Sequence, residues 1–453
     1  MNNIMHQTGL GLLDFALKRV VKNSGTVKLL RPVVKAFARS DLRRQQADKV
    51  FDNLQPGNKF YRIAERLHSL NDRSRNALLS NFGMKALSAK PTLDIGEKDR
   101  INAPQVLSIF PTMRCNLKCD YCYAPYDKTL DMPEEMLHRV LREASIFKTS
   151  FLCIAGGEPT LYKGLFDIFA QYPDLYFLVF TNGLALDEAA IDLIDKAGNV
   201  MPIFGLDGLG ETTAERRSSK TWEHFTQTSR ILRDRGMAFG FSCHVDQRNF
   251  QEAYSVKFAE TMAQSGALCG WYSHHIANDK SDFDNLVLTP AQRIDALTRI
   301  EALRERFPMI LIDSATDPRY QGGCPAGGYT FLHIDNRGNI SPCPFIPYPV
   351  GNLASMTLQE AIASGYFKSV RALGRMNAPR DQVAGCIALD KHDKIIDITR
   401  LDRQAQAAGA KAVADKWEPM RERYHQYQRE LDIYIADNVV IQRSHDRETS
   451  QST

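Results

Sequence analysis

Three closely spaced cysteines, Cys115, Cys119 and Cys122, are the residues of this 453-residue chain whose types and spacing point most clearly to chemistry. They follow a short apolar run, 106–110, that is typical of a buried β-strand. Three thiolates can hold three irons of a cubane cluster and leave the fourth iron open for a cofactor or substrate. A tetrahedral structural zinc site needs a fourth ligand, and none is evident nearby. The spacing favours an iron–sulfur cluster and leaves zinc or chance spacing as alternatives.

Four further motifs each follow a short apolar run, at the place where a strand would end. The first contains two glycines, which let the backbone approach a ligand closely, and Glu158, whose carboxylate can accept hydrogen bonds from an ammonium group. Each motif is weak by itself, because a sequence such as Thr-Asn-Gly is also typical of an ordinary turn. In chain order the motifs are Gly156-Gly157-Glu158-Pro159, Thr181-Asn182-Gly183, Gly205-Leu206-Asp207-Gly208 and Arg248-Asn249.

The cysteine segment from Arg114 to Cys122 closely resembles the signature of the radical S-adenosylmethionine (SAM) superfamily, which includes an aromatic residue, here Tyr121, just before the third cysteine. The four strand-end motifs resemble, in the same order, the family's GGEP motif, its ribose-contacting turn, its strand-four motif and the pair that often follows strand five. The resemblance covers about 105–310, and five signals in order make it specific.

The resemblance implies a 4Fe–4S cluster on Cys115, Cys119 and Cys122, whose open iron binds SAM. One-electron cleavage of SAM would give a 5′-deoxyadenosyl radical that abstracts hydrogen from an unactivated position, while the protein orients the cofactor and excludes water. Tyr121 would lie against the adenine, with ordinary core packing as the alternative. The other residues that the resemblance assigns to cofactor binding are Gly156, Gly157, Glu158, Pro159, Thr181, Asn182, Asp207 and Arg248.

A second group of cysteines, Cys324, Cys343 and Cys386, lies in the stretch 320–395, which is rich in glycine and proline. A small β-rich domain of this kind is held poorly by a hydrophobic core alone, so a metal staple would help it. Together with Gly338 and the later Gly351-Asn352-Leu353, the pattern resembles the auxiliary-cluster domains of radical SAM enzymes, SPASM and its shortened form twitch.

The number of cysteines in this stretch departs from the fuller family pattern, which contains several more. Two complete auxiliary clusters held by cysteine are therefore excluded, and the resemblance implies one 4Fe–4S cluster on the three cysteines. Its fourth ligand would be Asp390, which follows Cys386 with x3 spacing, or an exchangeable group. The alternative is a lost cluster whose cysteines are simply buried.

Other polar residues near the expected barrel mouth could contact the substrate or supply a base, although satisfied structural residues are the alternative. These candidates are His244, His274, His275 and Asp279. Three remaining cysteines lie within apolar runs and are expected to be core residues. They are Cys153, Cys243 and Cys269.

From residue 105 onward, apolar runs alternate with amphipathic helical patterns. Six successive βα units predict parallel strands with right-handed crossovers, and with the resemblance they predict an α/β fold built on a partial (β/α)6 TIM-type barrel. Chemistry in such folds gathers at the carboxyl ends of the strands. The expected strands are 106–110, 151–155, 176–180, 202–206, 239–243 and 271–276, and the expected helices are 133–147, 163–171, 187–197, 222–235, 251–265 and 290–306.

The chain is expected to divide into four parts. A basic helical N-terminal extension, 1–100, precedes the barrel, 101–315. The small β-rich auxiliary domain, 320–395, is followed by a C-terminal helix and polar tail, 396–453. The last residues, 443–453, are polar enough to predict disorder.

The net charge of +4 conceals an asymmetry, because the first 100 residues carry 19 Lys and Arg against 9 Asp and Glu. The basic arm is most simply a solvated face, and peripheral contact with a membrane is the alternative. Whole-chain electrostatics give no reason to expect nucleic-acid binding.

No run approaches the roughly 20 apolar residues that span a bilayer, no export signal is evident, and the nine cysteines are clustered. We therefore expect reduced thiols and a cytoplasmic location, with attachment of the protein to the membrane surface as the alternative.

The predicted function is radical SAM chemistry on a peptide or protein, a cofactor precursor or a lipid, with an electron donor such as flavodoxin or ferredoxin. The opposing hypothesis is a non-catalytic iron–sulfur sensor or scaffold that retains the fold. An electron carrier has no need of an open iron, so the three-cysteine arrangement favours the enzyme.

Overall fold

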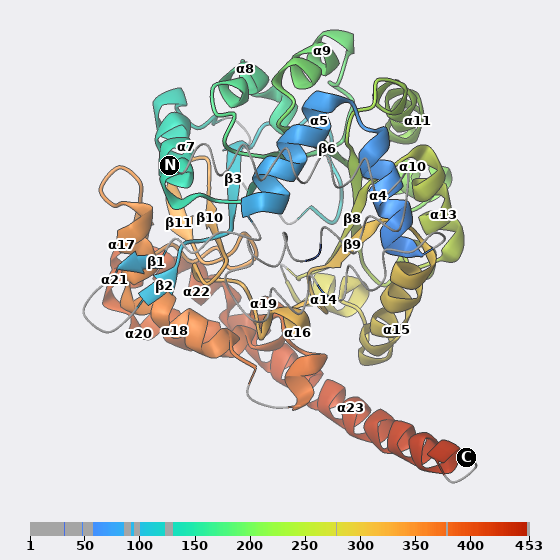
Figure 1. The fold of residues 1–453 in the computed structure, drawn as a ribbon. Coiled ribbons are helices and arrows are strands. Elements are labelled where there is room, and N and C mark those ends of the chain that lie inside the picture. Colours follow the sequence, from blue (N-terminus) through green and yellow to red (C-terminus); the bar gives the residue numbers. More distant parts are fainter. Residues whose placement is uncertain are drawn as a thin grey trace.

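A computed structural model describes Arg31, Asp48 and the segments 58–85, 92–94, 100–122, 130–277, 279–376 and 379–450 (Figure 1). Nearly all of the basic arm, 1–50, on which the expectation of membrane contact depends, lies outside these residues. Within the described residues, no helix is long and apolar enough to cross a membrane.

The core of the molecule is one ten-stranded sheet, in the order β12-β11-β10-β3-β4-β5-β6-β7-β8-β9. The strands from β3 to β9 are parallel to their neighbours, as the βα repeats predict. All six expected barrel strands are present, with ends that differ by at most a few residues. They are β3 (Val106–Thr112), β4 (Phe151–Gly156), β5 (Phe177–Thr181), β6 (Val200–Gly205), β7 (Gly240–Val245) and β8 (Cys269–His274).

Helices between the strands cover the outside of the sheet (Figure 1). Several begin at capping side chains: Asp187 accepts the N–H of Ala190, and Thr289 with Gln292 forms a capping box. Two helices, α10 and α14, were not expected. The bounds are α7 (Glu134–Phe147), α8 (Leu165–Ala170), α9 (Glu188–Ala197), α10 (Gly210–Arg216), α11 (Ser219–Asp234), α12 (Phe250–Ala253), α13 (Val256–Ser265), α14 (Lys280–Leu286) and α15 (Pro290–Arg306).

The small β-rich region continues the barrel sheet directly. Its first strand, β10 (Phe331–Ile334), pairs in parallel with β3, placing Phe331 opposite Val106. The predicted hairpin then joins β10 to β11 (Asn339–Ser341), and Gly338 supplies the positive φ of 82° that its turn needs. On the other side, β9 (Ile310–Asp313) adds a strand that was not expected. The remaining short elements of the region are α16 (Pro318–Gln321), β12 (Gly351–Asn352), α17 (Leu358–Ala363), α18 (Gly365–Gly374) and α19 (Ile387–Asp390).

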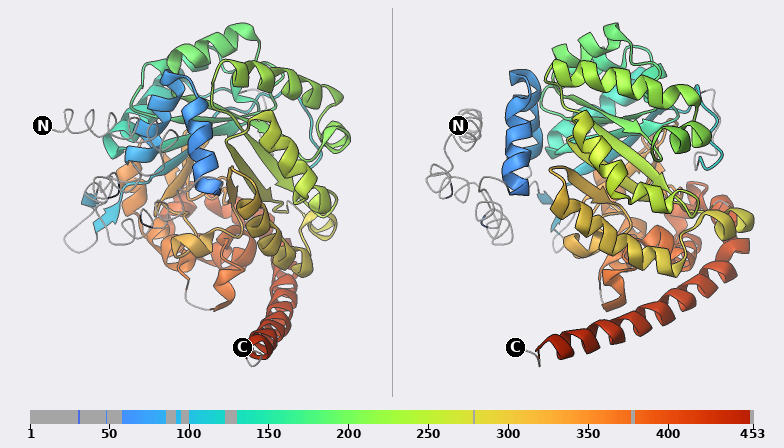
Figure 2. Two further views of the ribbon diagram at one scale, coloured as in Figure 1. Left: turned by 45° about the vertical axis from the view of Figure 1, so that its right-hand side comes forward. Right: turned by 90° about the vertical axis from the view of Figure 1, so that its right-hand side faces the viewer.

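Two short helices and a π-helical turn close the amino-terminal end of the barrel. They are α4 (Lys59–Ser69), α5 (Asp72–Ala77) and η2 (Leu78–Met84), and they lie against one end of the barrel in Figure 2. Leu78 packs with residues that stand just before or at the start of strands, among them Tyr176, Ala238 and Leu268. The barrel is therefore closed at the end opposite to the carboxyl ends of its strands. A short antiparallel pair, β1 (Thr92–Asp94) and β2 (Arg100–Asn102), precedes β3.

The C-terminal part is helical, with α20 (His392–Leu401), α21 (Arg403–Ala407), α22 (Ala410–Trp417) and α23 (Arg421–Ser450). The first half of α23 packs through Tyr424, Tyr427 and Leu431 against Phe283 of α14. Its second half runs away from the body (Figure 1). The helix of the structure extends to Ser450, into the stretch 443–453 for which disorder is expected.

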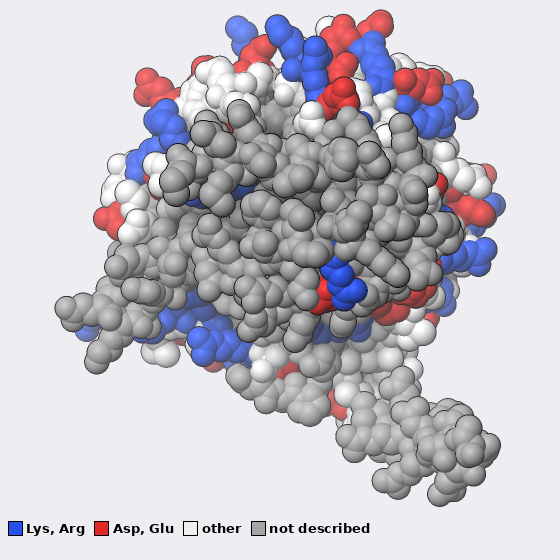
Figure 3. Space-filling view, viewed as in Figure 1, with Lys and Arg blue, Asp and Glu red and all other residues white. Residues whose placement is uncertain are grey.

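Charged side chains of both signs are interspersed around the rim of the face seen in Figure 3. Several form surface ion pairs, such as Arg235 with Asp192 and Lys59 with Glu305. Exposed pairs of this kind contribute little to stability, so the fold depends mainly on its buried core.

Arg66 gives a direct test of how the N-terminal helices are held. Its guanidinium donates to the backbone carbonyls of Ala267 and Pro308, at 2.5 and 3.3 Å, and also to that of Ala263 near the end of α13. Arg66→Met keeps the apolar stem but loses these bonds, so the free energy of unfolding should fall by about 1–3 kcal/mol. Urea denaturation measures it. The matched variant Arg73→Met, at an exposed position of α5, should stay within about 0.5 kcal/mol of wild type; equal losses in both variants would contradict the role given to Arg66.

Candidate active site

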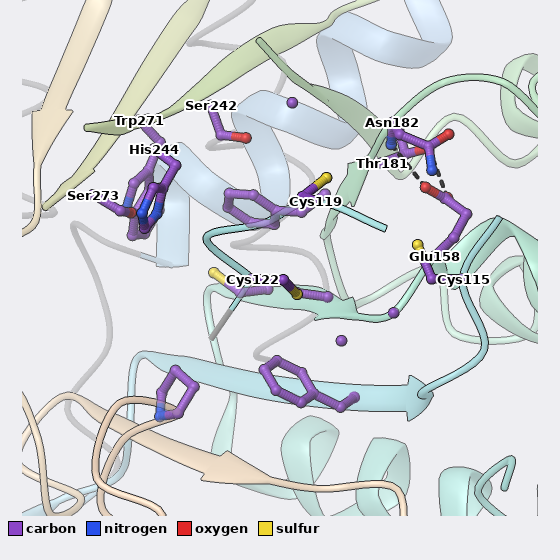
Figure 4. A pocket seen from close by; sticks show the side chains of 18 of the residues that line it. Cys115, Cys119, Cys122, Glu158, Thr181, Asn182, Ser242, His244, Trp271 and Ser273 are labelled. Atoms are coloured by element: carbon purple, nitrogen blue, oxygen red, sulfur yellow. Dashed lines mark hydrogen bonds between the residues drawn. The ribbon is translucent and has the colours of Figure 1, made fainter. Parts of the chain in front are cut away.

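A cavity of about 230 Å³ opens inside the barrel, beneath the carboxyl ends of its strands (Figure 4). It brings together the three cysteines of the signature segment and residues from most of the strand-end motifs. Its polar lining includes Cys115, Cys119, Cys122, Glu158, Thr181, Asn182, Arg217 and His244, and its aromatic lining includes Phe110, Phe180, Trp271, Phe331 and Phe345.

The three cysteines lie on the loop that follows β3. Cys115 and Cys119 are half-buried, Cys122 is exposed, and the N–H of Cys122 donates to the carbonyl of Cys119 at 3.3 Å, which closes a tight turn. The N–H of Leu117 donates to the sulfur of Cys115 at 3.4 Å. Burial raises the pKa of the Cys115 thiol, and the neighbouring Glu158, Cys119 and Cys122 raise it further. Such thiols ionise readily only when a cation or metal compensates the charge.

The donor set fits an iron–sulfur cluster, since three thiols line one cavity and thiolate is the ligand that such clusters use. Among the described residues, no three His, Cys, Asp or Glu side chains are gathered closely enough to hold a single metal ion. A cubane differs from a single ion because it distributes its protein ligands over separate irons. Three thiols that line one cavity are compatible with that arrangement.

Glycines 156 and 157 line the cavity and also allow a close contact between two segments of the backbone. A Cβ atom on Gly157 would lie 2.2 Å from the carbonyl oxygen of Arg114, and one on Gly156 would lie 2.6 Å from that of Thr112. Gly156 also has a positive φ of 114°. The two glycines thus let the end of β4 pack directly against the start of the cysteine loop.

Glu158 is almost fully buried, at 1% exposure, and serves as an acceptor for its own surroundings. Its Oε1 accepts hydrogen bonds from the N–H and hydroxyl of Thr160 and from the hydroxyl of Thr181, and its Oε2 accepts from the N–H of Asn182 at 2.7 Å. Burial raises the pKa of Glu158, and these hydrogen bonds act in the opposite direction. Oε2 keeps one lone pair that faces no described donor, so the carboxylate can still accept from a bound cation.

Asn182 joins the second motif to the cysteine loop. Its side-chain amide donates to Asn116 at 2.7 Å, and its own Oδ1 accepts the N–H of Leu184. Pro159, the last residue of the GGEP motif, begins a short 3-10 turn and is buried without lining the cavity.

Asp207 lies behind the cavity wall and is completely buried. It accepts hydrogen bonds from the hydroxyl of Tyr121, the N–H of His244 and the guanidinium of Arg217. Burial acts to raise the pKa of Asp207, but Arg217 and Arg216 outweigh it and hold the pKa below its usual value. The carboxylate is therefore ionised and bound to protein groups.

Arg248 lies at the end of β7 but not on the cavity wall. It pairs with Asp120 at 2.6 Å and with Asp246 at 2.8 Å. Arg248 thus ties β7 to the cysteine loop. Arg216 and Arg217, which surround Asp207, were not anticipated, because nothing in their local pattern distinguishes them from surface arginines.

The four polar candidates at the barrel mouth separate into different environments. His244 lines the cavity, and its Nε2 lies 3.0 Å from Nδ1 of His275, whose Nε2 lies 3.0 Å from Asp282. Burial lowers the pKa of His244 to about 3, so the ring is neutral at ordinary pH. The other two lie elsewhere: His274 contacts Tyr254 and Asp313, and Asp279 caps α14.

The auxiliary cysteines converge in the small β-rich region. Burial raises the pKa of Cys343, and the nearby thiols of Cys324 and Cys386 raise it further. The pKa of Cys386 is raised to about 12, mainly by burial and to a smaller extent by the nearby Cys324 and Asp390. The N–H groups of Ala326 and Ile387 donate to Cys324. Because Phe345 lines the barrel cavity, this second group of cysteines adjoins its wall.

Asp390 has partners of its own. Its two oxygens pair with the guanidinium of Arg293 at 3.1 and 3.2 Å, and Oδ2 also accepts the N–H of Cys386 at 3.0 Å. Both charged side chains are buried, with 1% exposure. Asp390 therefore fixes the position of Cys386, whether or not it contacts a metal.

Comparison with known proteins agrees with this geometry. Residues 109–254 match the family model of the Radical SAM superfamily. This segment is therefore a radical SAM domain. The expected α/β architecture is confirmed as well: SuiB of Streptococcus suis, in its complex with the precursor peptide SuiA, shares the fold with a TM-score of 0.52 at 16% identity, over 63% of this chain and 71% of SuiB.

Two curated relatives resemble the chain in sequence. PqqA peptide cyclase of Granulibacter bethesdensis is 24% identical over 259 residues, which cover 54% of this chain and 68% of the relative. The sporulation killing factor maturation protein SkfB of Bacillus subtilis is 26% identical, over 55% of this chain and 62% of its own length. The chain thus spans about two thirds of these relatives.

The hydrogen bonds of Glu158 predict the effect of replacing it. In Glu158→Gln the new NH2 group would face a backbone donor, either the N–H of Asn182 or the N–H of Thr160. The free energy of unfolding of the cluster-free protein should fall by about 1–3 kcal/mol. Urea denaturation measures this loss, with Glu188→Gln, at a position whose side chain is 82% exposed, as the control that stays near wild type. No difference between the two variants would show that these bonds contribute nothing.

Proposed function

We propose that this enzyme holds a 4Fe–4S cluster on Cys115, Cys119 and Cys122 and uses it to cleave SAM reductively. The observation that carries the proposal is the convergence of these three thiols with Glu158 on one cavity inside the barrel. When bound, the cluster supplies the electron that converts SAM into methionine and a 5′-deoxyadenosyl radical, which then abstracts hydrogen from the substrate.

The residues around the cavity have separable tasks in this proposal. The free lone pair of Glu158 accepts from the ammonium group of SAM, and the bonds from Thr181 and Asn182 hold the carboxylate in place for it. The aromatic side chains exclude water from the part of the cavity where the radical would react. His244, neutral and held by His275, is one of the polar groups of β7 and β8 available to the substrate, together with Ser242 and Ser273.

The substrate that the comparisons favour is a peptide or protein side chain. PqqA peptide cyclase and the maturation protein SkfB are relatives by sequence, and SuiB was solved with a precursor peptide. A cofactor precursor or lipid is the less favoured alternative. A small redox protein such as flavodoxin or ferredoxin would supply the electron.

We also propose a second 4Fe–4S cluster on Cys324, Cys343 and Cys386. The support is the mutual proximity of the three thiols, together with N–H groups aimed at Cys324. Since Arg293 already engages both oxygens of Asp390, we favour an exchangeable fourth ligand over Asp390.

The first cluster is tested by the triple variant Cys115→Ala, Cys119→Ala, Cys122→Ala. After anaerobic reconstitution and chemical reduction, wild type should convert SAM into 5′-deoxyadenosine, and the triple variant should form none, because no thiolate remains to hold the cluster. The product is measured by liquid chromatography and mass spectrometry. Cys269→Ala, which removes a thiol outside both groups, should keep the activity. Equal product from wild type and the triple variant would refute the assignment.

The second cluster is tested by iron content. The reconstituted wild type should contain about eight Fe per chain, and the variant with Cys324, Cys343 and Cys386 all changed to Ala about four. Iron and acid-labile sulfide are measured on the same samples. A value near four in both proteins would mean that the small β-rich region holds no cluster.

A further inference from the structure

The turn that carries Cys119 and Cys122 is fastened to the barrel through both of its central residues. The backbone of the turn is closed by the bond from the N–H of Cys122 to the carbonyl of Cys119. Asp120, at its first central position, pairs with Arg248. Tyr121, at its second, donates its hydroxyl hydrogen to Asp207. Figure 4 shows that Cys119 and Cys122 face the same cavity as His244.

The two attachments differ in strength. The pair of Arg248 with Asp120 is exposed, with 43% and 61% of the side chains accessible, so water and salt screen it. The bond from Tyr121 to Asp207 is buried, at 5% and 0% exposure, and its acceptor is an ionised carboxylate. A buried, charge-assisted hydrogen bond is stronger than an exposed ion pair. Tyr121 is therefore the main attachment of the turn.

The ring of Tyr121 is also enclosed. It stacks on His244, with 4.5 Å between ring centroids and 13° between planes. The guanidinium carbon of Arg216 lies 4.4 Å from the same ring centroid. Tyr121 is 5% exposed and also contributes to the lining of the cavity. These contacts help to hold its hydroxyl group on Asp207.

The anchor at the far end is fixed as well. Asp207 lies at the end of β6 and is held by Arg217 at 3.0 Å and by the N–H of His244 at 3.1 Å. These contacts hold Asp207 in position behind the cavity wall. Cys119 and Cys122 must be held near each other and near Cys115, since thiolates that approach a common cluster repel one another.

We propose that Tyr121 is a positioning residue: its bond to Asp207 holds the Cys119–Cys122 turn in place. The contact between Tyr121 and Asp207 does not depend on the proposed function. Its consequence, that the turn holds two cluster ligands in place, rests on the proposed function. This positioning adds a second role to the expectation that Tyr121 lies against adenine, and it gives Asp207 and Arg248 the task of holding the cysteine loop.

The test compares Tyr121→Phe with Tyr254→Phe. The control also removes a buried tyrosine hydroxyl that donates to a buried aspartate, Asp313, but it lies outside the cysteine loop. In the cluster-free protein, amide hydrogen exchange of 115–122 should become roughly tenfold faster in Tyr121→Phe and stay unchanged in Tyr254→Phe. This measurement needs no cluster, so it decides the contact even if the proposed function fails.

Two further measurements on the reconstituted protein separate positioning from SAM binding. Iron release to a ferrous chelator should be several-fold faster in Tyr121→Phe, while the KM for SAM in 5′-deoxyadenosine formation should change by less than twofold. Arg248→Gln, which removes the exposed attachment, should show the same pattern with a smaller change. A tenfold rise in the KM for SAM with unchanged loop exchange and iron release would overturn the proposal, and so would no change in any of the three measurements.

Discussion

The site depends on one buried charge, the carboxylate of Asp207. Removing an ion from water costs several kcal/mol, and that cost is offset only where the charge is fully paired. Here the compensation comes from Arg216 and Arg217 after β6, from the backbone of His244 on β7, and from Tyr121 on the cysteine loop. The ends of two strands and the loop after a third must therefore come together, because each supplies part of the pairing that offsets the cost of burying the Asp207 carboxylate.

The two ends of the barrel have opposite physical character, which lets one end be stable while the other carries chemistry. At the amino-terminal ends of the strands, Leu78 and the helices around it complete an apolar cluster with Tyr176 and Leu268. At the carboxyl ends, Glu158 after β4 accepts a hydrogen bond from Thr181 of β5, and Asp207 after β6 accepts one from the N–H of His244 of β7. Parallel strands make this division general, since all their carboxyl ends lie on one edge.

Features that depend on local pattern could be predicted from the sequence. Periodicity and the strand-end motifs located all six expected barrel strands, and the three cysteines and Glu158 do line one cavity. Contacts between distant residues could not be predicted in this way. Tyr121 and Asp207 are 86 positions apart in the sequence, and Arg293 and Asp390 are 97 apart. The residues next to each of them in the sequence do not indicate which partner it will contact. The strand β9 was missed because four residues are too few to show a period.

The small β-rich region and the barrel form one structural unit around the cavity. Strand β10 pairs in register with β3, and Arg139 of α7 donates to the carbonyls of Leu353 and Met356 from the other side. Phe331 of β10 and Phe345 therefore complete a wall whose other members come from the barrel. Because β3 also leads directly into the cysteine loop, the pairing of β3 with β10 sets the distance between the two groups of cysteines. Sheet register, more than any flexible linker, thus fixes the relation between the two candidate cluster sites.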